Sequence, residues 1–166
     1  GPFPADDDGY RWVAVAVDVY SKWVEVALLK SKHAFMTARW LYTEVICRWG
    51  RPEFVRTDNG TEWMAEFEKQ CRMLGIVMRH STTGNKRANG QAEVVIRVLK
   101  AVVRRLMTED PSAYWSDAIP AALQCLRMAP TKAHGFPPFT VVTGAFPVLP
   151  AELPEQEYEL SADPTE

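Results

Sequence analysis

The amino-acid sequence predicts a single α/β domain. Its first half begins with two β-branched and aromatic runs, and from about residue 30 onward helical periodicity alternates with further short strands. The 166 residues are enough to bury a core, and a composition of 47% hydrophobic and 24% charged residues is ordinary for a globular protein. No apolar run approaches the roughly 20 residues that a membrane helix needs, and no signal peptide is visible. We therefore expect no membrane partner.

The elements follow one another in a regular order. Glycines that stop helices and polar turns that separate apolar runs mark the boundaries. Residues 1–9 are predicted to be an acidic, proline-rich leader, 10–146 the folded domain, and 147–166 an acidic, poorly ordered tail. Within the domain we expect strands at 10–19 and 23–29 joined as a hairpin, a helix at 33–49, a strand at 53–57, a helix at 61–74, a strand at 76–78 and a polar loop at 81–88.

The most regular stretch is the helix after that loop. Its apolar residues recur at steps of three and four and predict one buried stripe, formed by Ala92, Val95, Ile96, Leu99, Val102, Val103 and Leu106. The same spacing places Glu93, Arg97, Lys100 and Arg104 together on another face. That face either meets a polyanion or is a solvated surface with i,i+4 pairs worth a few tenths of a kcal/mol. A last helix is expected at 114–128, where Pro120 kinks or restarts it.

The net charge of −2 hides a strong asymmetry. All 19 Lys and Arg lie between Arg11 and Lys132, and residues 9–132 hold only 12 acids. A basic body can attract a nucleic acid, although a mixed solvated surface would give the same count. The three cysteines, Cys47, Cys71 and Cys125, are odd in number and far apart. They indicate a reducing compartment, so an intracellular location, nuclear or cytoplasmic, is expected.

Three motifs stand in order along the chain. Residues 17–25 read Val-Asp-Val-Tyr-Ser-Lys-Trp-Val-Glu, residues 57–63 read Thr-Asp-Asn-Gly-Thr-Glu-Trp, and residues 89–93 read Asn-Gly-Gln-Ala-Glu. Together they resemble the catalytic core of retroviral and gypsy-type retrotransposon integrases, and residues 134–144 resemble the stretch that closes this core in the gypsy branch. The resemblance implies an α/β, ribonuclease H-like fold, with a mixed sheet flanked by helices on both faces. It also implies a metal-dependent polynucleotidyl transferase that trims viral DNA ends and joins them to host DNA.

The chemistry of that family uses three carboxylates. They hold two Mg²⁺ ions about 3.5–4 Å apart, and magnesium favours oxygen ligands. The resemblance makes Asp58 the second acid and Glu93 the third. The family's first acid, which bridges the metals, lies one strand earlier, before a segment that Gly1-Pro2-Phe3-Pro4 resembles, so the first catalytic strand is expected to be missing from this chain. Asp18 takes the place of a non-catalytic aspartate, and we expect it to hydrogen-bond the turn backbone.

Positions around Glu93 also depart from the family pattern. Asn85-Lys86-Arg87 replaces a His-Pro-Gln-like run, and Val94 and Ile96 stand where the family has arginine and asparagine. Two polar neighbours of the site have thus become apolar, which fits a decayed active site. The basic character remains, and weak, non-specific DNA binding is expected through Lys86, Arg87, Arg97, Lys100 and Arg104.

Three functions stay open. The first, which we favour, is a domesticated and catalytically impaired integrase core that acts in nucleic-acid binding or protein assembly. The second is an active Mg²⁺-dependent integrase whose first strand is truncated, and the third is a ribonuclease H-like nuclease that cuts RNA. We also expect a homodimer. The family's two-fold interface uses the helices that match residues 33–49 and 114–128, which here supply large apolar side chains from Trp40, Trp49, Trp115 and Leu126.

Overall fold

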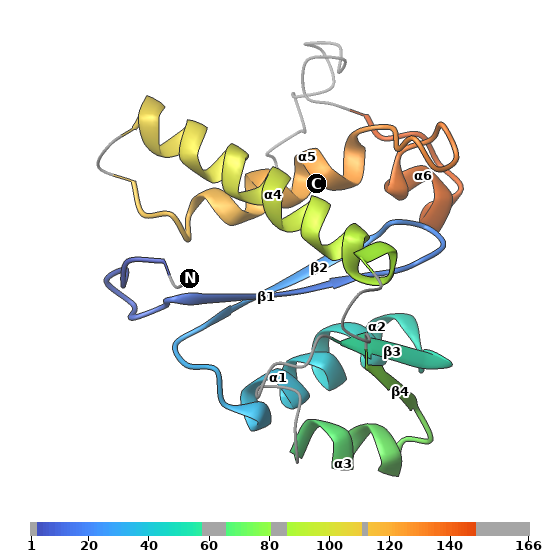
Figure 1. Ribbon diagram of the computed structural model, residues 1–166. Coiled ribbons are helices and arrows are strands. Elements are labelled where there is room, and N and C mark those ends of the chain that lie inside the picture. The colour runs from blue at the N-terminus through green and yellow to red at the C-terminus, as the bar shows by residue number, and fades with distance from the viewer. Residues whose placement is uncertain (1–2, 58–65, 81–85, 111–112, 149–166) are drawn as a thin grey trace, which may run out of the picture.

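The computed structural model describes residues 3–57, 66–80, 86–110 and 113–148 (Figure 1). These residues form four strands and several helices in alternating order, as the sequence predicts. The elements are β1 (Trp12–Val17), β2 (Val24–Leu29), α1 (Ala34–Trp40), η1 (Leu41–Ile46), α2 (Cys47–Trp49), β3 (Phe54–Thr57), α3 (Glu66–Met73), β4 (Val77–His80), α4 (Lys86–Glu109), α5 (Ala118–Met128) and α6 (Pro138–Thr143). No described helix has the length and apolar character needed to cross a membrane.

The predicted hairpin is confirmed. Strands β1 and β2 pair antiparallel, with Val17 opposite Val24 at the turn end. The turn is closed by Asp18, whose carboxylate accepts hydrogen bonds from the amide and the hydroxyl of Ser21, both at 2.7 Å. Asp18 therefore has the role in the turn that the sequence indicated for it.

Strands β3 and β4 pair parallel to one another in a second sheet. The single mixed sheet that we expected is not present within the described residues, because β1 and β3 are not hydrogen-bonded to each other. Joining the two pairs would need a strand that bonds to β1 on one side and to β3 on the other. Within the described residues, β1 is the first strand.

Three clusters of buried side chains hold the layers together. Helices α4 and α5 cover one face of the hairpin, through Leu99, Val103 and Ile119, and α1 lies on its other face (Figure 1). Trp40 of α1 packs on that second face. The third cluster joins α1, η1 and α3 to β3 and β4, with Phe67 at its centre. The run from α1 to η1 thus contacts both sheets, and it connects the two halves of the core.

Several helix boundaries differ from the prediction. Residues 34–49 are helical throughout, but the middle segment η1 is a π-helix. Helix α4 begins at Lys86, so the predicted loop at 81–88 overlaps its first turn. Helix α5 begins only at Ala118, so Pro120 lies in the first turn, where its missing amide costs no helical hydrogen bond. Helix α6, with Pro138 at its start, was not predicted.

The leader is packed against the start of the α5 region. The ring of Phe3 stacks on Trp115 at 4.3 Å between centroids, and the indole Nε1 of Trp115 donates to the carbonyl of Pro4 at 2.9 Å. Asp6 is buried beside them and accepts a hydrogen bond from the Tyr10 amide at 2.7 Å. Burial favours its neutral form, but its hydrogen bonds outweigh that effect and lower the pKa of Asp6 below 3.8.

A buried ion pair joins the hairpin to α5. The guanidinium of Arg127 donates to Glu25 Oε2 at 2.7 Å and, through Nε and Nη2, to the Val24 carbonyl at 3.0 and 2.8 Å. The other carboxylate oxygen of Glu25 accepts from the indoles of Trp23 and Trp49, each at 2.9 Å. Every side of this carboxylate is therefore paired, as a buried charge requires.

We expect Arg127→Met to lower the free energy of unfolding by about 3 kcal/mol, because it leaves the Glu25 charge without its cation. The Arg127 and Glu25 side chains are 23% and 9% exposed. The matched control is Arg72→Met, which breaks a pair with Glu68 whose side chains are 80% and 47% exposed and should cost less than about 0.5 kcal/mol. Urea unfolding measures both, and equal losses would contradict the role given to the buried pair.

Candidate nucleic-acid interface

Helix α4 is anchored by one buried stripe. Val95, Leu99 and Val103 follow one another at steps of four and are 9%, 1% and 2% exposed. They pack against α5 and the hairpin. Ile96 was predicted to belong to this stripe, but it is 39% exposed. Because successive residues on a helix are about 100° apart, Ile96 lies beside the stripe that contains Val95 and faces the solvent.

The predicted acidic and basic side chains form a separate face of α4. Glu93, Arg97, Lys100 and Arg104 are all exposed and recur at helical spacing along about 16 Å of the axis. In the part of the chain that the structure describes, none of the four forms an ion pair, although Glu93 and Arg97 have the i,i+4 spacing. Further along the helix, Arg105 and Glu109 do form such a pair at 2.9 Å. Arg97, Lys100 and Arg104 thus form an exposed basic face whose acidic neighbours within the described residues are not paired with them.

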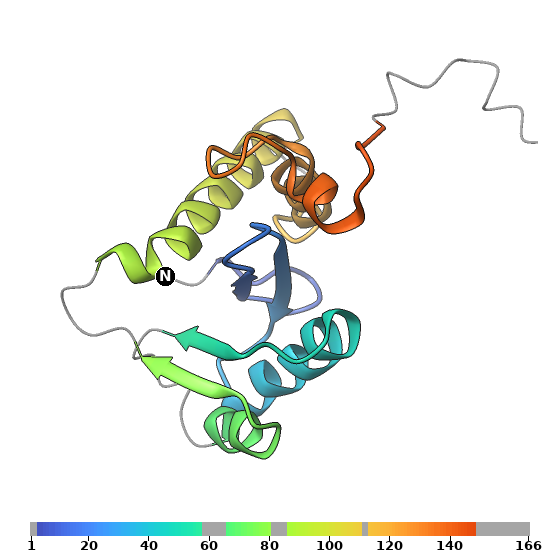
Figure 2. The same cartoon turned by 90° about the vertical axis from the view of Figure 1, so that its right-hand side faces the viewer.

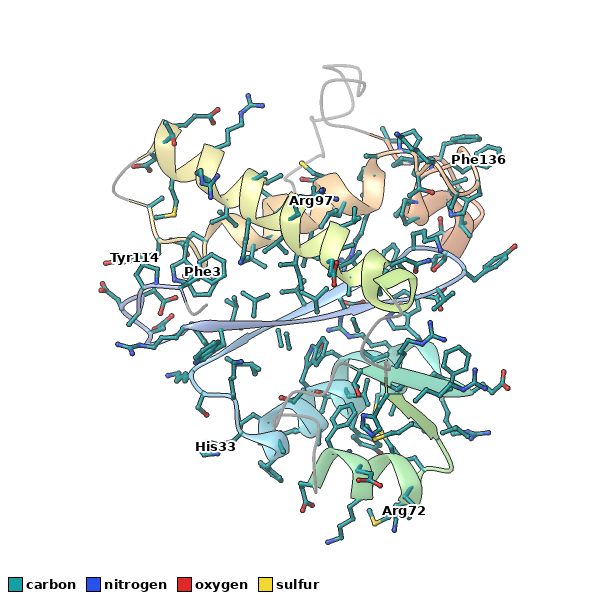
Figure 3. All side chains as sticks on the ribbon, viewed as in Figure 1. Phe3, His33, Arg72, Arg97, Tyr114 and Phe136 are labelled. Atoms are coloured by element: carbon teal, nitrogen blue, oxygen red, sulfur yellow. The ribbon has the colours of Figure 1, made fainter. Side chains whose placement is uncertain are left out.

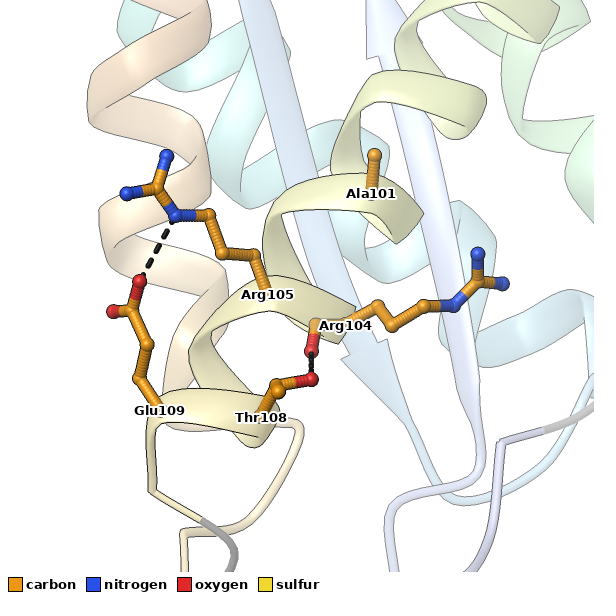
Figure 4. A pocket seen from close by; sticks show the side chains of 5 residues that line it. All are labelled: Ala101, Arg104, Arg105, Thr108 and Glu109. Carbon is orange, nitrogen blue, oxygen red and sulfur yellow. Dashed lines mark hydrogen bonds and ion pairs between the residues drawn. The ribbon is translucent and has the colours of Figure 1, made fainter.

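An open pocket lies at the C-terminal end of α4 (Figure 4). Ala101, Arg104, Arg105, Thr108 and Glu109 line it. Arg105 is held by Glu109, and Thr108 donates its hydroxyl hydrogen to the Arg104 carbonyl at 2.8 Å. Ala101 is the lining residue nearest to Glu93 along the helix, and it lies about two turns, or about 12 Å, further along the axis. The pocket therefore belongs to the basic end of the helix and not to the predicted carboxylate site.

The carboxylate site is described only on its α4 side. Glu93 is exposed in the first half of α4, whereas Asp58 lies outside the described residues. Thr57, immediately before Asp58, is the last residue of β3, and its hydroxyl lies 3.3 Å from His80 Nδ1 at the end of β4. Among the described side chains, no three or more of His, Cys, Asp and Glu are grouped to hold a metal. The described residues therefore supply one of the two predicted metal ligands.

Two further details concern the surroundings of Glu93. Val94 and Ile96 are 46% and 39% exposed, so their apolar side chains do not belong to the buried core. Lys86 and Arg87 lie in the first turn of α4 rather than in a loop, and their side chains are outside the described part. Their predicted role in DNA binding stays a prediction.

A basic pair on β3 and β4 was overlooked at the level of sequence. Arg56 and Arg79 are exposed and stand directly opposite one another in the parallel register. The alternation in Phe-Val-Arg-Thr and Val-Met-Arg-His could have indicated it, since a period of two puts alternate residues on one face. The missing information was the register, which depends on the pairing of two distant segments.

Comparison with known proteins assigns the family. Residues 2–86 match the integrase core domain. The Pol polyprotein of Radiation murine leukemia virus (strain Kaplan) is 30% identical over 142 residues, which are 85% of this chain and 24% of that protein. The Gag-Pol polyprotein of feline leukemia virus is 29% identical over 142 residues, 85% of this chain and 8% of that protein. The chain thus spans a quarter or less of these curated relatives.

Solved structures agree in fold. A chain of the simian T-cell lymphotropic virus intasome in complex with PP2A regulatory subunit B56 gamma matches with a TM-score of 0.72 and 22% identity, covering 85% of this chain and 51% of that chain. The HTLV-2 integrase catalytic core domain in complex with magnesium (trimeric form) matches with a TM-score of 0.64 and 24% identity. The match covers 80% of this chain and 84% of that chain.

The fold is the ribonuclease H-like fold of integrase catalytic cores. The chain belongs to the integrase core domain family, and its relatives are retroviral Pol proteins. The resemblance inferred from the three motifs is confirmed, as is the predicted fold class.

Proposed function

We propose that this chain is a catalytically impaired integrase core that binds DNA without sequence preference and acts in the nucleus or cytoplasm. The observation that carries this proposal is the exposed basic stripe of α4, where Arg97, Lys100 and Arg104 follow Glu93 without an acidic partner in the described part of the chain. Phosphate contacts of this kind supply most of the non-specific affinity for DNA. Membership of the integrase core family supports DNA as the polyanion.

The binding is expected to depend steeply on salt. Five phosphate contacts, from Lys86, Arg87, Arg97, Lys100 and Arg104, would give a slope of about −4.5 in log K against log salt, so affinity for duplex DNA should fall roughly 10²–10³-fold between 50 and 200 mM salt. Charge reversal at Lys100 and Arg104 should reduce the slope by about 2 units. Fluorescence anisotropy with duplexes of unrelated sequence measures both quantities.

A matched control reverses two charges on α3. Lys69→Glu with Arg72→Glu changes the net charge equally, on exposed residues of α3. Figure 3 shows Arg72 near the bottom of the molecule and Arg97 in its upper half. This variant should retain nearly the parental slope. Equal affinity at both salt concentrations, or equal losses in the two variants, would show that the α4 face is only solvated.

The proposed impairment follows from the acid set. The chemistry that the family resemblance implies needs one carboxylate that bridges two metal ions, and this chain offers Asp58 and Glu93 without a recognisable bridging partner. Two carboxylates could hold one Mg²⁺ weakly. Without the bridge, both acids repel each other and the second metal lacks an anchor. Val94 and Ile96, exposed next to Glu93, remove polar groups as well.

We expect the purified chain to show neither DNA end processing nor strand transfer in Mg²⁺ or Mn²⁺. The loss should amount to many orders of magnitude in rate, because positioning of both reacting oxygens is most of what two metals contribute. Gel assays compare the parent with Asp58→Asn and Glu93→Gln. Activity in the parent that both substitutions abolish would contradict the impairment and favour an active Mg²⁺-dependent integrase.

That alternative has one structural argument in its favour. Strands β1 and β3 each have a hydrogen-bonded partner on one side only within the described residues. A strand that bears an aspartate could join the two sheets and add the third acid. The HTLV-2 integrase core was solved in complex with magnesium, which shows the ion in a protein of this fold. Activity gained when such a strand is attached before residue 1, and lost again with Glu93→Gln, would establish it.

We also propose that the chain forms a homodimer, although not through all of the aromatic residues that the sequence suggested. Trp40 and Trp115 are 7% and 2% exposed. Both therefore fill the core of one chain and leave no apolar surface for an interface between two chains. Of the predicted aromatic residues, Trp49 is 48% exposed, and Phe35 at 59% and Tyr42 at 44% are also exposed on the same helical run. HTLV-2 integrase cores are known in dimeric and trimeric forms, which supports self-association of this fold.

Phe35→Asp with Tyr42→Asp is expected to convert a dimer at tens of micromolar into a monomer, because two charges would be buried in the apolar interface. Multi-angle light scattering reports the mass. Met73→Asp is the control, since Met73 is 74% exposed on α3 and is not part of the helical run that carries Phe35 and Tyr42. A parent chain that is already monomeric at this concentration would rule the dimer out.

A further inference from the structure

Large apolar side chains are exposed at the end of the molecule where the hairpin turn meets the segment around α6. Phe136, Phe146 and Val148 are 50%, 71% and 63% exposed, and the turn adds Val19 at 55% and Tyr20 at 82%. We call these five residues the aromatic patch. Clustered apolar surface of this kind is typical of interaction sites, whereas a single exposed apolar residue is not.

Two contacts hold the parts of the aromatic patch together. The rings of Phe136 and Phe146 lie 6.5 Å apart between centroids, with an angle of 56° between their planes. The ring of His134 joins this segment to the hairpin turn, because its Nε2 lies 3.3 Å from the carbonyl oxygen of Ser21. Figures 1 and 2 both show α6 and the hairpin turn at the same end of the molecule. The patch is therefore built from two distant parts of the chain.

The surroundings of the aromatic patch are basic. Residues 129–148 contain no Asp or Glu, and their one lysine, Lys132, is exposed. The hairpin turn carries Lys22, whose ammonium group donates to a carbonyl of the same turn. The acid of the turn, Asp18, already accepts hydrogen bonds from Ser21. A partner that complements the patch therefore combines apolar side chains with carboxylates.

The chain itself continues with a segment of that composition. Residues 149–166, which we call the C-terminal segment, follow Val148 directly and contain six Asp or Glu and no Lys or Arg. Leu153, Tyr158 and Leu160 stand between these acids. Because an extended chain spans at most about 3.6 Å per residue, Leu153 is never further than roughly 18 Å from Val148. The C-terminal segment thus starts at the patch and is long enough to return to it.

We propose that the C-terminal segment docks on the aromatic patch of the same chain. Its large apolar side chains cover Phe136 and Phe146, and its carboxylates face Lys22 and Lys132. Burial of the exposed rings is the main driving force, since ion pairs at a surface contribute little. Weak contacts suffice, because the short connection through Val148 gives the segment a high effective concentration at the patch. The inference goes beyond the proposed function and does not depend on DNA binding.

The test is the rate at which a glutamate-specific protease cuts the C-terminal segment of the full chain, followed by mass spectrometry. This rate tracks the fraction of molecules in which the segment has left the patch. Each rate is divided by that of a free peptide with the same sequence as the segment, which removes the intrinsic preference of the protease. The parent chain should be cut at least about tenfold more slowly than its peptide.

Substitutions on both sides of the contact should speed this cleavage. Phe136→Ser with Phe146→Ser should raise the corrected rate about tenfold, because the rings no longer hold the segment. Lys132→Glu should raise it about twofold to threefold, since a surface charge contributes less. Tyr158→Ser with Leu160→Ser should have as large an effect as the patch pair. The two serine pairs combined should give no further increase, because both remove the same contact.

The matched control is Met73→Ser with Val77→Ser. Both side chains are also exposed, at 74% and 53%, but they lie on α3 and β4. The corrected rate of this variant should equal that of the parent chain. Circular dichroism and thermal unfolding verify that each variant is folded.

Four results would overturn the inference. A parent chain that is cut as fast as the free peptide has no docked segment, and equal effects of the patch pair and the control pair would show no specific contact. Protection that grows between micromolar and tens of micromolar chain would place the segment on a second copy. Cleavage that is accelerated by Lys100→Glu with Arg104→Glu, but not by the patch pair, would place it on the basic face of α4.

Discussion

The carboxylate of Glu25 is the point on which the packing of distant segments depends. It is buried, and three groups converge on it: the indole of Trp23 just before β2, the indole of Trp49 at the end of α2, and the guanidinium of Arg127 on α5. Arg127 also stacks on Trp23 at 4.4 Å, so the guanidinium is held by charge, by hydrogen bonds and by an aromatic face. A buried charge tolerates few alternatives, since each arrangement that unpairs it is costly. The pair thus fixes how α5 lies against the hairpin, and α4 packs against α5.

The same packing determines which side chains of helix α4 are exposed to solvent. Its buried side, with Leu99 at 1% exposed, fixes both position and rotation. Once the rotation is fixed, the spacing of 3.6 residues per turn decides that Glu93, Lys100 and Arg104 share a solvent face. The contacts that bury Leu99 therefore also determine that the carboxylate and the bases of α4 face the solvent. Val94 and Ile96 add exposed apolar side chains beside them.

The two sheets differ in how far helices cover them. The hairpin is covered by helices on both faces, while helices cover β3 and β4 on one face only within the described residues. Side chains on the uncovered face are not selected for packing, so a charged pair such as Arg56 and Arg79 can persist there. The run from α1 to η1 is the element that keeps the two sheets in one body, because it contributes Trp40 to one cluster and Leu41 to another.

Local sequence determined much of this protein. Alternation and turn residues predicted the hairpin, and apolar periodicity predicted most of α4. Three short motifs indicated the family. Each of these signals depends on residues that are close together in the chain. Only the tertiary structure decided which tryptophans are internal, that Ile96 lies outside the buried stripe, and that Glu25 and Arg127 meet across 102 positions. It also decided that Arg56 faces Arg79. Burial and strand register arise from contacts between distant segments, and a single run of residues contains no record of them.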